Sequence, residues 1–373
     1  MKQSLQFTIL IVLSVLIACS PNALPNQSIK IGAILPLSGA NAVYGAEIQN
    51  AIELAKDEIN SKGGINEHLL EVVYEDDQTD PKVGVTAMQK LAEVDKVSVV
   101  LGPWASGVAV AAAPVAERNK VIMLCEAIAP SISSAGDFIF RIQPPVKDYA
   151  EAAAKYARSL NIKNASIIFI NNEFGVALKD EFGRFFLQYG GTIVAQEEYE
   201  ANAQDYRTPL MKIKEKSPEV VFVAGYQELV SVIKQIDELR MDVKVFTGPP
   251  FESQRIVEAL GPLAEGVVYS YHFAADEANP RNVDYRNNYF ARFGKQTQVF
   301  GPLMYDGMYI VANAMKVCGE DSSCIRDELY KTSYDGVVGT TTFDKNGDSK
   351  SAVFMKTVKE GRFVRISPNV QKN

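Results

Sequence analysis

A serine stands at the point where a buried apolar segment ends and a helix is expected to begin. The stretch LGPWASGVAVAAAPVAERNKVIM places Trp104, the only tryptophan of the chain, Ala105 and Ser106 just after the predicted strand VSVVLGP. A hydroxyl beside free backbone N–H groups at a helix N-terminus suits a carboxylate, and each charge-assisted hydrogen bond contributes about 1.5–3 kcal/mol. Ser106 is therefore a candidate anion-binding residue, although the same side chain also suits a helix cap. The small residues that follow predict room for a ligand, with Trp104 as its floor.

The next predicted strand, VIML, also ends in residues of interest. It runs into Cys125, Glu126, Ala127 and Ile128. Ligands of open α/β sheets bind beyond the carboxyl ends of the strands, so this loop is expected near Ser106. Glu126 either meets a cation there or faces solvent, and the sequence leaves both open. Cys125 is expected to be a buried free thiol.

Motifs of known catalytic chemistry are missing from the chain. It contains no G-x-S-x-G, no G-x-x-x-x-G-K and no H-E-x-x-H. The acidic stretch EDDQTD is explained by a turn that ends in a helix-capping Asp80, and DKNGDSK by a hairpin turn at Asn346-Gly347. Two histidines, His68 and His272, leave little room for an imidazole metal site. We expect a binding protein without catalysis, metal or cofactor.

The bulk composition is that of an ordinary globular protein. The chain has 373 residues, of which 47% are hydrophobic and 22% charged, enough for two domains with sizeable cores. A net charge of -7 argues against a nucleic-acid partner.

The N-terminus has the pattern of an export signal. Lys2 precedes an apolar run over 5–17 that is short for a membrane span. The sequence Leu-Ile-Ala-Cys ending at Cys19 resembles the bacterial lipobox. That resemblance implies a signal peptide over 1–18, lipidation of Cys19 and a tether over 19–27, which would anchor the protein to the bacterial cell membrane on its outer side. An ordinary signal peptide or an uncleaved anchor is the alternative.

Two later cysteines are close in sequence. Cys318 and Cys324 flank the polar loop GEDSS after a predicted helix. In an exported protein this spacing suits a local disulfide. The pair also has a metal-ligand spacing, but no further cysteine or histidine lies near it in the sequence.

Strands and helices alternate along the chain in two runs. The first run holds predicted strands around 28–37, 69–77, 97–103 and 121–124, and the second holds strands around 165–170, 191–199, 218–226 and 243–249. Helices are predicted again over 283–331, before closing strands. Buried strands joined by helices predict an α/β protein with two Rossmann-like lobes and parallel sheets.

Four stretches together resemble a known family. They are IKIGAILPLSGANAVYGAEIQNAIELAKDEINSKGGI, YEDDQTDPKVGVTAMQKL, VVLGPWASGVAVAAAPV and YDGVVGTTTFDKNGD. In this order they are similar to the leucine/isoleucine/valine-binding proteins, which have the type I periplasmic-binding-protein fold. The resemblance implies a monomer that binds a small molecule by hinge closure and passes it to an ABC permease. It also implies a three-segment hinge, with lobe 1 formed by 28–142 plus 272–338 and lobe 2 by 143–271 plus 339–373.

The resemblance also implies contacts for an amino-acid ligand. The family's serine for the ligand carboxylate corresponds to Ser106, but its threonine partner is replaced by Ile128. A tyrosine and a glutamate hold the ammonium in the family. Tyr226 matches the tyrosine, whereas Pro250 stands at the glutamate position. Glu252 lies two residues further on, where it either substitutes or serves the first turn of the next helix.

Aromatic residues occupy other contact positions of the family. Tyr44, Phe174 and Phe300, together with Trp104, imply a largely apolar ligand. Because the threonine and the aligned glutamate are missing, we rank a branched or aromatic amino acid first, an aromatic or aliphatic carboxylate second, and amides or other polar solutes third. A ligand-sensing partner of a signalling protein is the alternative function.

Overall fold

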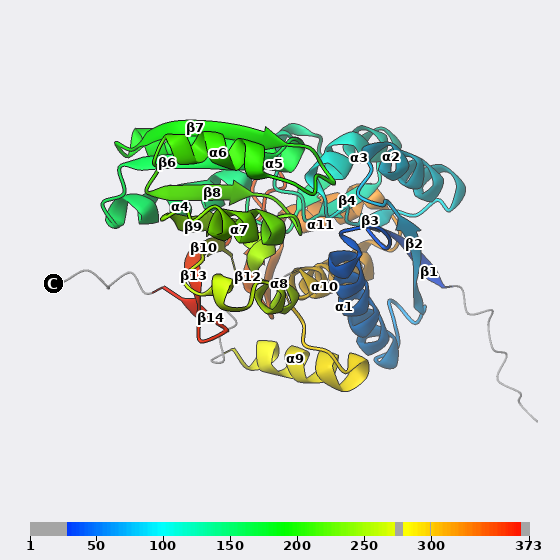
Figure 1. The fold of residues 1–373 in the computed structure, drawn as a ribbon. Coiled ribbons are helices and arrows are strands. Elements are labelled where there is room, and N and C mark those ends of the chain that lie inside the picture. Colours follow the sequence, from blue (N-terminus) through cyan, green and yellow to red (C-terminus); the bar gives the residue numbers. More distant parts are fainter. Residues whose placement is uncertain (1–27, 273–278, 299, 367–373) are drawn as a thin grey trace, which may run out of the picture.

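The computed structural model describes residues 28–272, 279–298 and 300–366, and these form two lobes, each built on its own β-sheet (Figure 1). The predicted signal peptide and the lipid anchor at Cys19 lie outside the described residues. Within the described part, no helix is both long and apolar enough to cross a membrane.

Lobe 1 contains a five-stranded parallel sheet in the order β2-β1-β3-β4-β5. Successive side chains of a strand point to opposite faces. Ile31 and Ala33 of β1 therefore share a core with α1 and α10, whereas Ile34 packs with α2 and α3. The elements of this lobe are β1 (Ile29–Leu35), α1 (Ala42–Ser61), β2 (Leu70–Asp76), α2 (Pro81–Gln89), β3 (Val99–Leu101), α3 (Ser106–Asn119), β4 (Ile122–Cys125), β5 (Ile139–Arg141), α9 (Pro280–Phe293), α10 (Gly301–Cys318) and α11 (Ser322–Tyr330).

Lobe 2 contains a seven-stranded sheet in the order β14-β13-β10-β9-β8-β6-β7. The strands β6 to β10 are parallel, and the closing hairpin β13-β14 adds two antiparallel strands at one edge. The elements of this lobe are α4 (Val146–Ser159), β6 (Asn164–Ile170), α5 (Glu173–Gln188), β7 (Thr192–Tyr199), α6 (Arg207–Glu215), β8 (Val220–Ala224), α7 (Leu229–Glu238), β9 (Lys244–Thr247), α8 (Gln254–Leu260), β10 (Val268–Tyr271), β13 (Phe354–Lys359) and β14 (Arg362–Arg365).

Local signals in the sequence produce the expected helix ends in lobe 1. The carboxylate of Asp80 accepts hydrogen bonds from the backbone N–H groups of Lys82 (2.7 Å) and Val83 (3.4 Å), and so caps α2. The small residues of α3 serve packing rather than a ligand. Ala109 and Ala112 are fully buried in the core between α3, α2 and the sheet. The prediction that they leave room for a ligand was wrong, because alanines here let two helices approach closely.

The chain crosses between the lobes three times. The first follows β5 at residue 142, and the second follows β10, after which α9 and α10 pack against α1 of lobe 1. The third crossing comes later than predicted. After the small β11-β12 hairpin (Ser333–Gly336 and Gly339–Thr342), residues 347–349 still bind the edge of β5, where the Arg141 N–H donates to the Gly347 carbonyl (2.8 Å). The predicted boundary at 339 is therefore too early, and the third crossing falls between Ser349 and β13.

A buried ion pair explains why this segment stays with lobe 1. The Arg141 side chain is fully buried and donates from Nε to Asp348 (3.0 Å) and from Nη1 to the Ala129 carbonyl (2.8 Å). A buried guanidinium without such acceptors would be costly. The turn at Asn346-Gly347 predicted from the sequence presents Asp348 to it.

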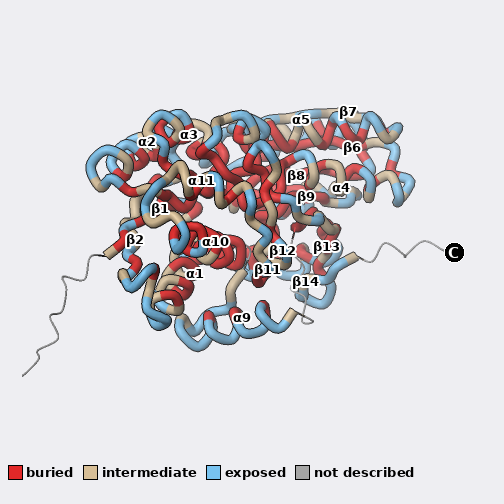
Figure 2. Tube along the Cα trace, turned by 180° about the vertical axis from the view of Figure 1, so that it is seen from behind, coloured by how far each residue is buried: buried red, intermediate tan, exposed pale blue. Residues whose placement is uncertain are grey.

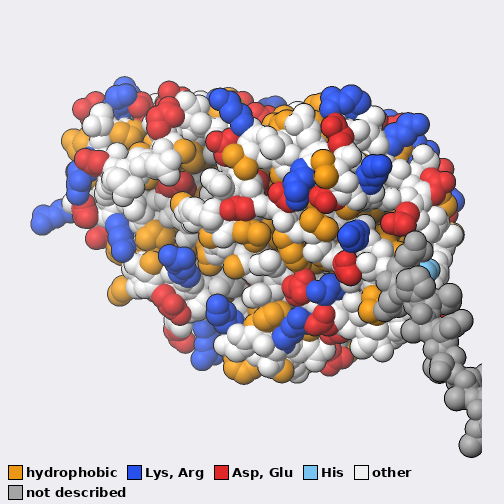
Figure 3. Space-filling view, turned by 90° about the vertical axis from the view of Figure 1, so that its right-hand side faces the viewer, with side chains coloured by type: hydrophobic (Ala, Val, Ile, Leu, Met, Phe, Trp, Pro, Cys, Tyr) orange, Lys and Arg blue, Asp and Glu red, His pale blue; other side chains and the backbone are white. Residues whose placement is uncertain are grey.

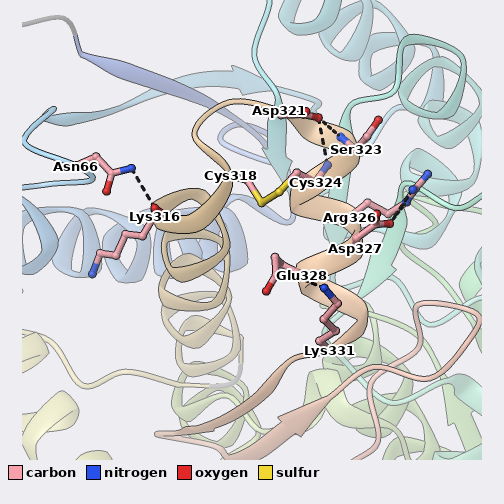
Figure 4. Close-up of a disulfide and its surroundings, with 10 residues drawn as sticks. All are labelled: Asn66, Lys316, Cys318, Asp321, Ser323, Cys324, Arg326, Asp327, Glu328 and Lys331. Atoms are coloured by element: carbon pink, nitrogen blue, oxygen red, sulfur yellow. Dashed lines mark hydrogen bonds and ion pairs between the residues drawn. A yellow bond between two sulfur atoms is a disulfide. The ribbon is translucent and has the colours of Figure 1, made fainter.

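Burial and cysteine chemistry agree with the sequence. Buried residues are concentrated in both sheets and along α10, while α9 is mostly exposed (Figure 2). A disulfide joins Cys318 and Cys324 across the turn between α10 and α11, and Asp321 within this turn caps the start of α11 (Figure 4). Cys125 is a buried free thiol. On the face of the molecule shown in Figure 3, charged side chains of both signs are interspersed rather than gathered by sign.

Candidate ligand-binding site

A small cavity lies between the lobes at the carboxyl ends of their parallel strands. About 10 Å³ of it is open to the centre of a water molecule, which is the space of roughly one water. A solute with a leucine-sized side chain therefore enters only if the lobes or the lining rings move apart. The residues that line it are Trp104, Ser106, Glu126, Ile128, Gln143, Phe174, Tyr226, Pro249, Pro250 and Phe300.

Aromatic rings from both lobes form the walls. Tyr44 of α1 stacks on Trp104 with ring centroids 4.7 Å apart, and Phe300 meets both rings edge-on. From lobe 2, Tyr226 lies 4.9 Å from Trp104 and stacks on Phe174 at 4.4 Å. The Tyr44 hydroxyl also donates to the Pro250 carbonyl across the cleft (3.2 Å). These contacts continue from one lobe to the other and favour a closed arrangement around an apolar body.

Ser106 is the first residue of α3 and is buried at the cavity. Its hydroxyl accepts a hydrogen bond from the backbone N–H of Ile128 at 3.2 Å. Burial raises the pKa of the Tyr226 hydroxyl well above its usual value, Glu228 adds to this shift, and the Ser106 backbone N–H opposes it. Ser106, at the start of α3, and Tyr226 of lobe 2 thus line the same cavity. Hydroxyl and N–H together form a donor pair of the kind a carboxylate needs.

Glu126 follows β4 and is 1% exposed. It lines the cavity, yet neither carboxylate oxygen has a hydrogen-bond partner among the described residues. Burial, with a smaller contribution from Glu47, raises the pKa of this carboxyl well above its usual range. Of the two interpretations left open by the sequence, exposure to solvent is therefore wrong.

Glu252 is not in the cleft, contrary to its prediction as a candidate ligand-binding residue. Its side chain is 12% exposed in lobe 2, where Lys356 pairs with one oxygen and the Tyr269 hydroxyl donates to the other at 2.9 Å. Glu252 does not take the alternative role in the first turn of α8 either. Lys356 lies on β13, and this contact between residues far apart in the sequence gives Glu252 a structural role. Pro250, at the family's glutamate position, does line the cavity.

A second buried carboxylate positions an aromatic wall. Glu47 on α1 accepts hydrogen bonds from the backbone N–H groups of Gln298 (2.6 Å) and Gly301 (3.1 Å). Carboxylates favour helix N-termini, and here one holds the start of α10. Phe300, the residue before α10, is thereby fixed against Trp104.

Four predicted residues stay outside the lining, and two lining residues were missed. Tyr44, Ala105 and Ala127 are buried close to the cavity but are not among the described residues that line it, and Glu252 lies elsewhere in lobe 2. Gln143 and Pro249 line it and were not predicted. Gln143 comes just after β5, so the strand-end rule would have found it had the three-residue strand been recognised. No group of histidine, cysteine, aspartate or glutamate suited to a metal ion exists among the described residues.

A cleft between two α/β lobes joined by three segments defines a hinged solute receptor. Residues 28–362 match the family described as periplasmic binding protein, and the chain belongs to this family of extracytoplasmic receptors. It is 27% identical to Leu/Ile/Val-binding protein homolog 1 of Brucella suis over 86% of this chain and 88% of that one. It is 26% identical to the Leu/Ile/Val-binding protein BraC3 of Rhizobium johnstonii over 89% and 91%.

A solved structure extends the comparison. The branched-chain amino acid transporter substrate-binding protein LivJ of Streptococcus pneumoniae, in complex with isoleucine, superimposes with a TM-score of 0.84 at 27% identity, covering 91% of this chain and all of that one. A solute-binding protein from R. palustris in complex with benzoate shares the fold, with a TM-score of 0.84 at 19% identity over 91% and 95% of the two chains. The chain is therefore a solute-binding protein of the branched-chain amino acid ABC transporter type, and these relatives are binding proteins rather than enzymes.

Proposed function

We propose that the protein captures a small apolar amino acid, or a related carboxylate, between its lobes and presents it to the permease of an ABC importer. The observation that carries this is the cavity itself. It joins aromatic walls from both lobes to the Ser106 hydroxyl at the start of α3. The names of the relatives, which specify leucine, isoleucine and valine, support the same class of ligand.

Closure would follow from contacts made by both lobes. A ligand held at Ser106 and Trp104 of lobe 1 would gain contacts with Phe174 and Tyr226 only when lobe 2 swings in. Such differential contacts shift the population from open to closed. The closed form would then dock on the permease as a monomer, with the protein held at the membrane by a lipid on Cys19.

A carboxylate without an amino group is the second candidate ligand. It is favoured by the engagement of Glu252 with Lys356, and by Pro250 at the place of the family's glutamate. Lobe 2 therefore offers no carboxylate to an ammonium among the described lining residues.

Thermal unfolding of the protein from Ser28 onward, with apolar amino acids and with matched carboxylates, tests this proposal. A ligand at a hundred times its dissociation constant stabilises by about 2.7 kcal/mol. Ser106→Ala should weaken the ligand by about 1.5–3 kcal/mol, since it removes one donor to a carboxylate. Ser166→Ala, at another buried serine in β6, is the matched control and should leave affinity unchanged. No stabilisation by any of these compounds would contradict the proposal.

A further inference from the structure

Glu126 has an unusual position for a carboxylate. It is 1% exposed, it lines the cleft, and both of its oxygens lack a partner among the described residues. A buried polar group without a partner is destabilising, and a buried charge more so. A carboxylate at this buried position is therefore best explained by a partner that arrives with the ligand.

Among the residues that the structure describes, the groups that act on Glu126 do not supply a positive charge. Glu47 of α1 is the charged group that acts on it, with the same sign. Glu126 in turn acts on the phenols of Tyr149 on α4 and Tyr271 on β10, which are neutral. Arg141 is already bound to Asp348. The site around Glu126 therefore needs a cation or a proton from elsewhere.

The position beside Ser106 suggests which cation. In an α-amino acid the carboxylate and the ammonium are bonded to one carbon, so the groups that hold them must lie close together. Ser106 and Glu126 line the same small cavity, while the described lining residues of lobe 2 are aromatic rings, prolines and Gln143, none of which carries a charge. Aromatic faces, Trp104 above all, further favour an organic cation.

We propose that Glu126 binds the ammonium group of the ligand while Ser106 and the start of α3 bind its carboxylate. Lobe 1 alone would then bind both charged groups of an amino acid. This inference rests on the proposed function. It places the ammonium on lobe 1 in a chain whose lobe 2 has a proline where a glutamate would be expected.

Three ligands with the same branched alkyl group test the inference by calorimetry. Leucine carries both charges, 4-methylpentanoate only the carboxylate, and 3-methylbutylamine only the ammonium. The wild-type protein should prefer leucine to 4-methylpentanoate. In Glu126→Gln, leucine should weaken about 10- to 150-fold, the equivalent of one lost charge-assisted bond, whereas 4-methylpentanoate should bind equally well or more tightly. Glu252→Gln, at the ion-paired carboxylate of lobe 2, should keep the wild-type preference.

Proton release gives a second readout that folding alone does not move. Leucine binding should release a proton from Glu126 in the wild type, measured in buffers of different ionisation enthalpy, and release none in Glu126→Gln. An unchanged preference between leucine and 4-methylpentanoate in Glu126→Gln would overturn the inference. Equal binding of leucine and 4-methylpentanoate by the wild type would also overturn the inference. The proposed function would stand in that case. If the wild type binds none of the apolar amino acids or carboxylates, the proposed function itself fails.

Discussion

Each lobe of this protein holds a largely buried glutamate near the end of a strand, and the two glutamates differ in their surroundings. Glu252 of lobe 2 is held by Lys356 and by the Tyr269 hydroxyl, and its place is explained by the fold. Glu126 of lobe 1 has no partner among the described residues and faces the cleft. The comparison teaches that burial alone does not distinguish a structural carboxylate from a ligand-binding one. The hydrogen-bond and ion-pair partners that each carboxylate has within the protein do distinguish the two.

The largest effect is expected from removing the partner of Glu252. Lys356→Met should destabilise the protein by about 3–5 kcal/mol in urea unfolding, because it leaves a buried carboxylate without its cation. Affinity for the ligand should not change, since the pair lies outside the cleft. Lys350→Met, at an exposed lysine, is the control. A loss below about 1 kcal/mol would show that Glu252 does not depend on this pair.

A change in folding stability of the opposite sign is expected from a substitution at Glu126. Glu126→Gln should stabilise the folded protein near neutral pH, by on the order of 1–3 kcal/mol, because it removes a buried ionisable group without a partner. Burial raises the pKa of this carboxyl, so the folded state binds a proton that the unfolded state releases above its own pKa. The gain should therefore grow as the pH rises above about 4.3. Destabilisation by this substitution would place Glu126 with Glu252 among the structural carboxylates.

Asp77 is intermediate between Glu252 and Glu126 in the number of partners that its carboxylate has. One of its oxygens accepts from the Thr79 N–H (2.7 Å), the other has no partner among the described residues, and burial raises the pKa of its carboxyl to about 6. Between pH 4 and 6 the folded state holds a proton that the unfolded state loses, so this group removes stability as the pH rises, by at most about 1.4 kcal/mol per pH unit. Asp77→Asn should flatten the stability profile in this range by that amount. Profiles of equal slope for both proteins would contradict this assignment.

The smallest effect concerns the contact that joins the lobes. Tyr44→Phe keeps the ring on Trp104 but removes the hydroxyl that donates to the Pro250 carbonyl. Ligand affinity should fall by about 0.5–1.5 kcal/mol through weaker closure, measured by calorimetry. Tyr330→Phe, whose hydroxyl reaches the Asp137 carbonyl within lobe 1, should have no such effect. Equal affinities of Tyr44→Phe and the wild type would show that this bond does not help closure.

Local patterns were enough for much of the fold and part of the site. Alternating buried strands and helices predict the two lobes, and the strand-end rule predicts that Ser106 and Glu126 lie together. The role of Glu252 was not predictable, because Lys356 is far away in the sequence and no local pattern pairs them. The alanines of α3 fit either a roomy cleft or close helix packing, and only the tertiary contacts of Ala109 and Ala112 decide between these.

The most direct test of the account is a crystal structure of the protein with the amino acid that stabilises it most. We predict the ligand ammonium within hydrogen-bond distance of a Glu126 carboxylate oxygen, the ligand carboxylate at the Ser106 hydroxyl, and the apolar side chain between Trp104 and Tyr226. An ammonium bound to lobe 2, with Glu126 still unpartnered, would contradict the claim that lobe 1 reads both charges.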